Sequence, residues 1–174
     1  MTHQDSLAQN KNGFTLVELL VVIAIIALVA VFAAVAVNSA RSKQRDATRL
    51  ASVRQMQSAL EDYFNETNQY PTGSLLPLGD ISQSSCLGQD GFKADCSTSQ
   101  SVFLRVVPPM YEDGLKGIVS CGEPSRRAYC YSQLNEGESY VIHFELENGL
   151  ATVGLQKGVN CATPDGMEAG VCAK

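Results

Sequence analysis

The stretch Phe14-Thr15-Leu16-Val17-Glu18-Leu19 opens an apolar run that continues to Val37. From Leu19 to Val37 there are 19 consecutive apolar residues, with no glycine, proline or charge among them. At ~1.5 Å per residue, a helix of that length measures roughly 28 Å, close to the ~30 Å hydrocarbon thickness of a bilayer. The segment is therefore long enough to span a membrane.

Glu18 is the one charged residue between Phe14 and Val37. A charged side chain costs about 2.5–3.5 kcal/mol at the bilayer centre, less near its edge, and is rarely kept there without a partner. We therefore expect a basic group to meet Glu18.

The residues around Glu18 suggest what that group is. Lys11-Asn12-Gly13-Phe14-Thr15-Leu16-Val17-Glu18-Leu19-Leu20 resembles the class III leader and first helix of type IV pilins and type II secretion pseudopilins. The resemblance implies that a prepilin peptidase cuts between Gly13 and Phe14 and that the new Phe14 amine is methylated. It also implies that Glu18 pairs with a Phe14 amine during filament assembly. The specific motif covers residues 11 to about 40, and beyond about residue 72 the resemblance is only architectural.

Two other classes of segment also contain a long apolar run. A secretory signal peptide has a core of ~7–15 apolar residues and an A-x-A-like cleavage site. Ala34-Val35-Ala36 offers such a site, but the run is too long for that class. An uncleaved signal anchor fits the length and gives no reason for Glu18.

The two signals for orientation disagree. Residues 41–54 carry five basic residues and one acidic residue, so the positive-inside rule places the carboxyl side in the cytoplasm. The mature part also holds six cysteines, an even number that suits three disulfides in an oxidising compartment. Because the leader motif agrees with the cysteines, we expect a single-pass inner-membrane protein with its head outside the cytoplasm, which later joins a surface filament.

Near-neighbour cysteines are expected to form these bridges, although six cysteines allow 15 pairings. The expected pairs are Cys86 with Cys96, Cys121 with Cys130, and Cys161 with Cys172. Each bridge would hold a loop in a part of the chain with few apolar residues.

Beyond the apolar run, apolar residues recur at three- and four-residue steps, which predicts an amphipathic continuation of the same helix. The predicted stripe is Ala47, Leu50, Val53, Met56, Leu60, Tyr63 and Phe64. Asn, Pro and Gly from residue 65 to 73 predict its end. The expected organisation is a leader (1–13), a membrane or filament-core helix (14–37), the amphipathic half of that helix (38–66) and a globular head (67–174).

The head is predicted to contain a β-meander at about residues 128–155. Residues 128–134 and 140–147 are rich in β-formers and flank the hairpin signal Asn135-Glu136-Gly137-Glu138. Asn148-Gly149 predicts a type I′ turn into a third strand at 150–155. Little regular structure is expected from 73 to 126. The fold class is therefore α+β, a long N-terminal helix packed on a small antiparallel sheet and stapled by disulfides.

The second predicted strand places Ile142, Phe144 and Leu146 on one face and His143, Glu145 and Glu147 on the other. The apolar face is expected to lie on the helix. The polar face is expected to lie in solvent, although a histidine beside two carboxylates also resembles an acid/base pair. Since no nucleophile elbow, P-loop or dinucleotide fingerprint accompanies it, we expect neither an enzyme nor a cofactor.

Metal and nucleic-acid sites are also not expected. Asn160, Asp165 and Glu168 supply oxygen donors for calcium, but no EF-hand spacing exists, and turn chemistry explains the same loop. Residues 65–174 have seven basic and thirteen acidic groups, a balance that disfavours contacts to phosphate backbones.

Taken with the resemblance, these features predict a pilin, a structural subunit of a type IV pilus or a related filament. Its expected partners are other pilins, the prepilin peptidase, the inner-membrane assembly platform and the lipid bilayer. The alternative within the family is a type II secretion pseudopilin. The alternative from another class is a signal-anchored extracellular binding module that forms no polymer.

Overall fold

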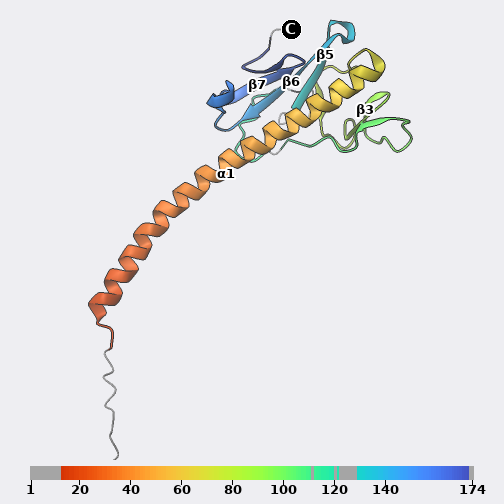
Figure 1. Ribbon diagram of the computed structural model, residues 1–174. Helices are drawn as coiled ribbons and strands as arrows, with labels where there is room; N and C mark the ends of the chain where they lie inside the picture. Colours follow the sequence, from red (N-terminus) through yellow and green to blue (C-terminus); the bar gives the residue numbers. More distant parts are fainter. Residues whose placement is uncertain (1–12, 111, 120, 122–128, 173–174) are drawn as a thin grey trace, which may run out of the picture. The chain divides into compact units, whose positions relative to one another are not determined.

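A computed structural model describes residues 13–110, 112–119, 121 and 129–172 (Figure 1). The chain divides into two units, Met1–Ala40 and Arg41–Lys174, which are described in turn. The described elements are the helix α1 (Leu16–Thr67), strands β1 (Leu76–Leu78), β2 (Cys86–Gly88), β3 (Gly91–Lys93), β4 (Val102–Leu104), β5 (Tyr129–Leu134), β6 (Ser139–Leu146), β7 (Gly158–Thr163) and β8 (Gly166–Ala169), and 3₁₀ turns η1 (Asn135–Gly137) and η2 (Ala151–Val153).

The first unit is the amino-terminal part of α1 with the residues that precede it. Every residue from 13 to 40 is exposed, including the whole apolar run. By length and composition, α1 is long and apolar enough to cross a membrane. A helix that is apolar on all sides is stable only where lipid or other chains surround it. The membrane-helix prediction therefore agrees with the structure of this unit.

In the second unit, the rest of α1 packs on the head, and most of the predicted stripe is buried. Leu50, Val53, Met56 and Leu60 are at most 6% exposed. Ala47 was wrongly placed in the stripe, because it is exposed while its neighbour Asp46 is buried. The polar contacts of Asp46, described below, turn this part of the helix toward the sheet.

The helix ends at Thr67, close to the predicted break. Asn68 has a left-handed backbone with φ 57°, and its N–H donates to the Phe64 carbonyl at 2.7 Å. Asn is one of the residues that adopt this conformation most readily after a helix. The next residues turn back toward the sheet, where the Tyr70 N–H donates to the Gly137 carbonyl at 2.9 Å.

The main sheet has five antiparallel strands in the order β1-β5-β6-β7-β8. In Figure 1 the helix lies across β5 and β6. The helix and the sheet share one core, which contains Met56, Tyr131 and Phe144. The hairpin between β5 and β6 confirms the predicted turn. The Glu138 N–H donates to the Asn135 carbonyl at 3.1 Å, and the two residues between them, Glu136 and Gly137, have positive φ of 55° and 101°.

The predicted third strand at 150–155 is wrong. Leu150 and Leu155 form only an isolated bridge around η2, and the third strand of the meander is β7, which pairs Ala162 with Ile142. A type I′ turn needs positive φ at both central residues, but only Gly149 of the Asn148-Gly149 pair has it. The chain therefore makes a longer excursion before it returns to β6. The start of the meander at Ala128 lies outside the described residues.

The region from 73 to 126 holds more structure than predicted. β2 pairs with both β3 and β4 in a three-stranded antiparallel sheet, and β1 joins the main sheet beside β5. These strands have three residues each, which is too short for a period-two pattern to show in the sequence.

Three disulfides hold the head. They join Cys86 to Cys96, Cys121 to Cys130 and Cys161 to Cys172, with Cα–Cα distances of 6.1, 5.2 and 5.8 Å. The pairs are the near neighbours named from the sequence. An α+β fold with a long helix, antiparallel sheets and disulfide staples is therefore confirmed.

Candidate functional site

The junction predicted for cleavage lies just before the helix. Gly13, Phe14 and Thr15 are non-helical and exposed, and α1 begins at Leu16. A Cβ placed on Gly13 would meet no atom within 4 Å. Proteases cleave exposed, irregular backbone segments most easily. Lys11 and Asn12, the leader residues of the motif, lie outside the described residues.

Glu18 and Thr15 form a reciprocal cap on the first turn of α1. The Glu18 carboxylate accepts from the Thr15 backbone N–H at 2.9 Å and from its hydroxyl at 2.7 Å. In return, the Thr15 hydroxyl oxygen accepts from the Glu18 N–H at 3.2 Å. These bonds satisfy donors that every helix leaves unpaired at its amino-terminal end.

The role of Thr15 was missed, although its signal was present in the sequence. Thr15-Leu16-Val17-Glu18 before an apolar run has the spacing of a capping box. The cap also gives Glu18 a structural role at the helix start, and the helix of an ordinary membrane anchor could use the same cap. It holds the carboxylate against Thr15, one residue from the Phe14 nitrogen that cleavage would turn into an amine. An experiment on Glu18 must therefore separate its charge from its cap.

A second group of polar residues joins α1 to the head, and we call Arg45, Asp46, Arg49 and Glu147 the clamp. The Arg45 Nε and Nη2 donate to the two Glu147 oxygens at 2.7 and 2.6 Å. The Arg49 Nη1 donates to Asp46 at 2.9 Å and to Glu147 at 2.7 Å. The side chains of Asp46 and Arg49 are at most 1% exposed, so these charges are paired away from water.

Backbone groups complete the clamp. Asp46 accepts from the N–H groups of Glu147 and Asn148, both at 2.8 Å, and the Arg49 Nη2 donates to the Asp113 carbonyl at 2.5 Å. One helix turn thus holds the end of β6 and the segment around residue 113. Buried ion pairs are tolerated when additional hydrogen bonds satisfy the remaining donors and acceptors. These backbone contacts supply such hydrogen bonds to Asp46 and Arg49.

The polar face of β6 was wrongly predicted to lie in solvent. Glu145 is 3% exposed, and its carboxylate accepts from the N–H groups of Lys116, Gly117 and Ile118 at 2.7, 2.9 and 3.1 Å. Together with the clamp contacts of Glu147, these bonds give both carboxylates structural partners within the chain. The arrangement therefore does not supply the acid/base pair considered for His143, Glu145 and Glu147.

Hydrogen bonds from Arg45 and then Arg49 lower the pKa of Glu147 from its ordinary value of 4.5, although burial opposes the shift. Gly114 leaves room for this carboxylate, because a Cβ there would lie 2.0 Å from Glu147 Oε2, and its φ is 80°. Glycine is thus required on both conformational and steric grounds.

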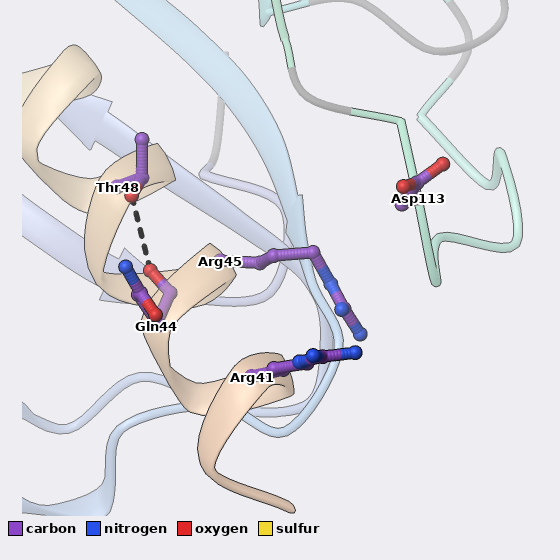
Figure 2. A pocket seen from close by; sticks show the side chains of 5 residues that line it. All are labelled: Arg41, Gln44, Arg45, Thr48 and Asp113. Atoms are coloured by element: carbon purple, nitrogen blue, oxygen red, sulfur yellow. Dashed lines mark hydrogen bonds between the residues drawn. The ribbon is translucent and has the colours of Figure 1, made fainter. Parts of the chain in front are cut away.

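An open groove of about 500 Å³ lies beside the clamp. It is lined by Arg41, Gln44, Arg45, Thr48 and Asp113. Figure 2 shows the two arginine side chains extending from successive turns of α1 with their guanidinium groups next to one another, and Asp113 across the opening. The groove therefore presents positive charge on one wall and a carboxylate on the other.

The residues considered for calcium do not converge. The Asn160 side chain is buried and holds its own loop, accepting from the Gln156 N–H and donating to the Gln156 and Gly158 carbonyls, all at 2.9 Å. Asp165 and Glu168 are exposed. Within the described ranges, no group of three or more His, Cys, Asp or Glu residues is placed to hold a metal ion.

Residues 8–34 match the family model described as the prokaryotic N-terminal methylation motif. The chain therefore carries the motif found in the class III leader of type IV pilins and type II pseudopilins, and the match covers this leader and the first part of α1. Pilin-type proteins with this motif are a structural class rather than a known class of enzymes. Comparisons with curated proteins and with solved structures gave no significant match.

Proposed function

We propose that this protein is a structural subunit of a type IV pilus or a related filament. Cleavage after Gly13 would remove residues 1–13, and the Phe14 amine would be methylated. Residues 14–37 would form the membrane anchor and later the filament core, residues 38–66 would join that core to the head, and residues 67–174 would form the outer surface. The head would lie outside the cytoplasm.

The observation that carries this proposal is the position of the Thr15–Glu18 cap. It holds a carboxylate beside the Phe14 backbone at the start of a helix whose first 25 residues, 16–40, are all exposed. In an apolar filament core, the ammonium of one subunit needs a carboxylate, because an unpaired charge there is costly. Glu18 is the one acidic residue between Phe14 and Val37 that can supply it.

Two variants separate the charge of Glu18 from its cap. Glu18→Gln removes the charge but keeps a side-chain oxygen in a residue type that also forms capping boxes. Thr15→Ala keeps the charge and removes the hydroxyl, at a cost of about 1 kcal/mol to the helix end. Glu18→Gln should be cleaved normally and yield far fewer sheared filaments, whereas Thr15→Ala should yield nearly normal amounts.

The ratio of cleaved subunit in membranes to subunit in sheared filaments measures this effect. Normal filament yield from Glu18→Gln would remove the charge-pairing role. Equal losses in both variants would show that the cap, and not the charge, limits assembly.

The type II secretion pseudopilin stays the second candidate, because it shares the same leader. Electron microscopy of surface fibres, with mass spectrometry of their subunits, separates the two. Abundant long fibres of this chain favour the pilus. Their absence, with loss of protein secretion in a deletion strain, favours the pseudopilus. A binding module on an uncleaved anchor would show neither cleavage at Gly13 nor fibres.

A further inference from the structure

The groove beside the clamp has a charge pattern that the filament role does not use. Arg41 and Arg45 are four residues apart on α1 and line the same wall. Like charges at this spacing repel each other on a helix. Glu147 binds Arg45 at 2.6 and 2.7 Å, whereas Arg41 is exposed and forms no ion pair with another described residue. Since Glu147 already balances the charge of Arg45, Arg41 is the cation that an anion in the groove would pair.

The chemistry of the wall suits a phosphate. A guanidinium binds phosphate oxygens through two parallel N–H bonds, and the Gln44 side chain lines the same groove, whereas the Thr48 hydroxyl donates to the Gln44 carbonyl at 3.1 Å. Since Glu147 holds the Arg45 guanidinium in place, less rotamer entropy is lost when a ligand binds. The carboxylate of Asp113 on the other side disfavours a simple anion and favours a ligand that also carries a positive charge.

The position of Arg41 in the chain suggests where such a ligand is found. Arg41 follows Val37, the last residue of the apolar run, by four residues. Four residues of helix rise by ~6 Å, and the headgroup layer on each side of a bilayer is roughly 5–8 Å thick. Basic residues next to a membrane span are attracted to lipid headgroups.

We propose that this groove binds one phospholipid headgroup that carries both a phosphate and a primary amine, as in phosphatidylethanolamine. The phosphate lies on Arg41 and Arg45, and the ammonium faces Asp113, whose carboxylate oxygens can each accept more than one hydrogen bond. The bound lipid holds the subunit in the bilayer before assembly. The role of the lipid before assembly rests on the proposed function. Lipid binding itself does not, because it requires neither cleavage nor a filament.

The test uses the full chain in nanodiscs of phosphatidylcholine that contain a minor fraction of phosphatidylethanolamine. After mild delipidation, native mass spectrometry measures which lipid stays bound. Phosphatidylethanolamine should be retained in preference to phosphatidylcholine. Arg41→Gln should lower its retention about tenfold, as expected for the loss of charge-assisted hydrogen bonds. Lys43→Gln is the matched control, because it removes the same charge from the same helix outside the groove.

Asp113→Asn tests the other wall. It should abolish the preference between the two lipids while leaving phosphate-dependent retention in place, and it should raise the retention of phosphatidylglycerol. Soluble phosphoethanolamine, added to the same mixed nanodiscs, should displace phosphatidylethanolamine only weakly, since it lacks the anchoring chains.

Four results would overturn the proposal. They are equal retention of both lipids by the unmodified chain, equal losses in Arg41→Gln and Lys43→Gln, an unchanged lipid preference in Asp113→Asn, and a filament defect in Arg41→Gln with normal lipid retention. The last result would assign the groove to a carboxylate of a neighbouring subunit. Because lipid retention and filament yield are measured separately, failure here leaves the proposed function intact.

Discussion

The two units of this chain are stabilised in different ways. Residues 13–40 are exposed throughout, and hydrogen bonds between Thr15 and Glu18 cap the start of their helix. Residues 41–172 contain a buried core, three disulfides and a buried ionic clamp. The first unit depends on what surrounds it, whereas the second is held by contacts within the chain. Conditions that break the head should therefore leave the apolar helix folded in its bilayer.

Reduction should give the largest difference between the units. The disulfides join residues 10, 9 and 11 positions apart, and each loop of about that size contributes roughly 3 kcal/mol on the chain-entropy account. All six tyrosines lie in the second unit, between residues 63 and 140, so their near-ultraviolet circular dichroism in the full chain in detergent reports on that unit. Reduction should abolish this tyrosine signal and preserve most of the helical signal.

An alkylated but unreduced sample is the control for reagent effects. Six reactive thiols before reduction would argue for a cytoplasmic head and contradict the expected orientation. Peptide mapping with crossed bridges would contradict only the pairing.

Loss of the clamp should have the next largest effect. Asp46→Ala removes one of the acceptors of Arg49 and leaves the N–H groups of Glu147 and Asn148 without the carboxylate that accepts from them. Breaking a buried ion pair by removing one partner costs about 3–5 kcal/mol. Denaturant unfolding, followed by the tyrosine signal, should show this loss in the head. Asp62→Ala, at an exposed carboxylate of the same helix, should change stability by less than about 0.5 kcal/mol.

A cost below about 1 kcal/mol for Asp46→Ala would mean that the clamp adds little to the packing around it. The helix and the sheet would then be held together by apolar contacts alone, and the proposed contrast between the units would be weaker.

The clamp also shows what the sequence could not reveal. Asp46 and Arg49 look like ordinary charges on a solvated helix face, and Glu147, about a hundred residues later, looks like the exposed side of a strand. No local pattern links residues so far apart. The same limit produced the wrong third strand, since Asn148-Gly149 is a strong local turn signal that the packing of β7 against β6 overrides.

Local signals succeeded where a structure is determined by neighbours in the chain. The helix, its end at Thr67, the β5–β6 hairpin and the leader motif all depend on residues within a few positions of each other. Of the candidate site, the junction around Gly13 and Glu18 was visible in the sequence. The clamp and the groove were not, because they are assembled from α1, β6 and the segment around Asp113.

Acid should weaken the clamp in a defined direction. The arginines lower the pKa of Glu147 from 4.5, so its contribution to stability is present above about pH 4.5 and is lost as pH falls through the folded-state pKa. The difference in unfolding free energy between the unmodified chain and Glu147→Gln should therefore be largest near neutral pH and shrink below pH 4.5. A difference that stays constant down to pH 3 would contradict this assignment.

The smallest expected effect is at the hairpin. Glu136 is exposed and has φ 55°, a conformation that costs most non-glycine residues roughly 1–2 kcal/mol. Glu136→Gly should stabilise the head by about 0.5–1 kcal/mol after the entropy of glycine is counted. Glu138→Gly, at a residue with φ −77° and ψ −17°, should destabilise it by a similar amount. Equal signs for the two variants would contradict the turn geometry.

The mature amino terminus tests the central claim most directly. Intact mass and terminal peptide analysis of membrane and filament material should find a chain that begins at methylated Phe14. Gly13→Val should stay uncut, and because a Cβ at Gly13 meets no atom within 4 Å, this loss would reflect recognition by the peptidase and not misfolding. Recovery of only the Met1 form, or of a chain that begins near Asn38, would contradict the account.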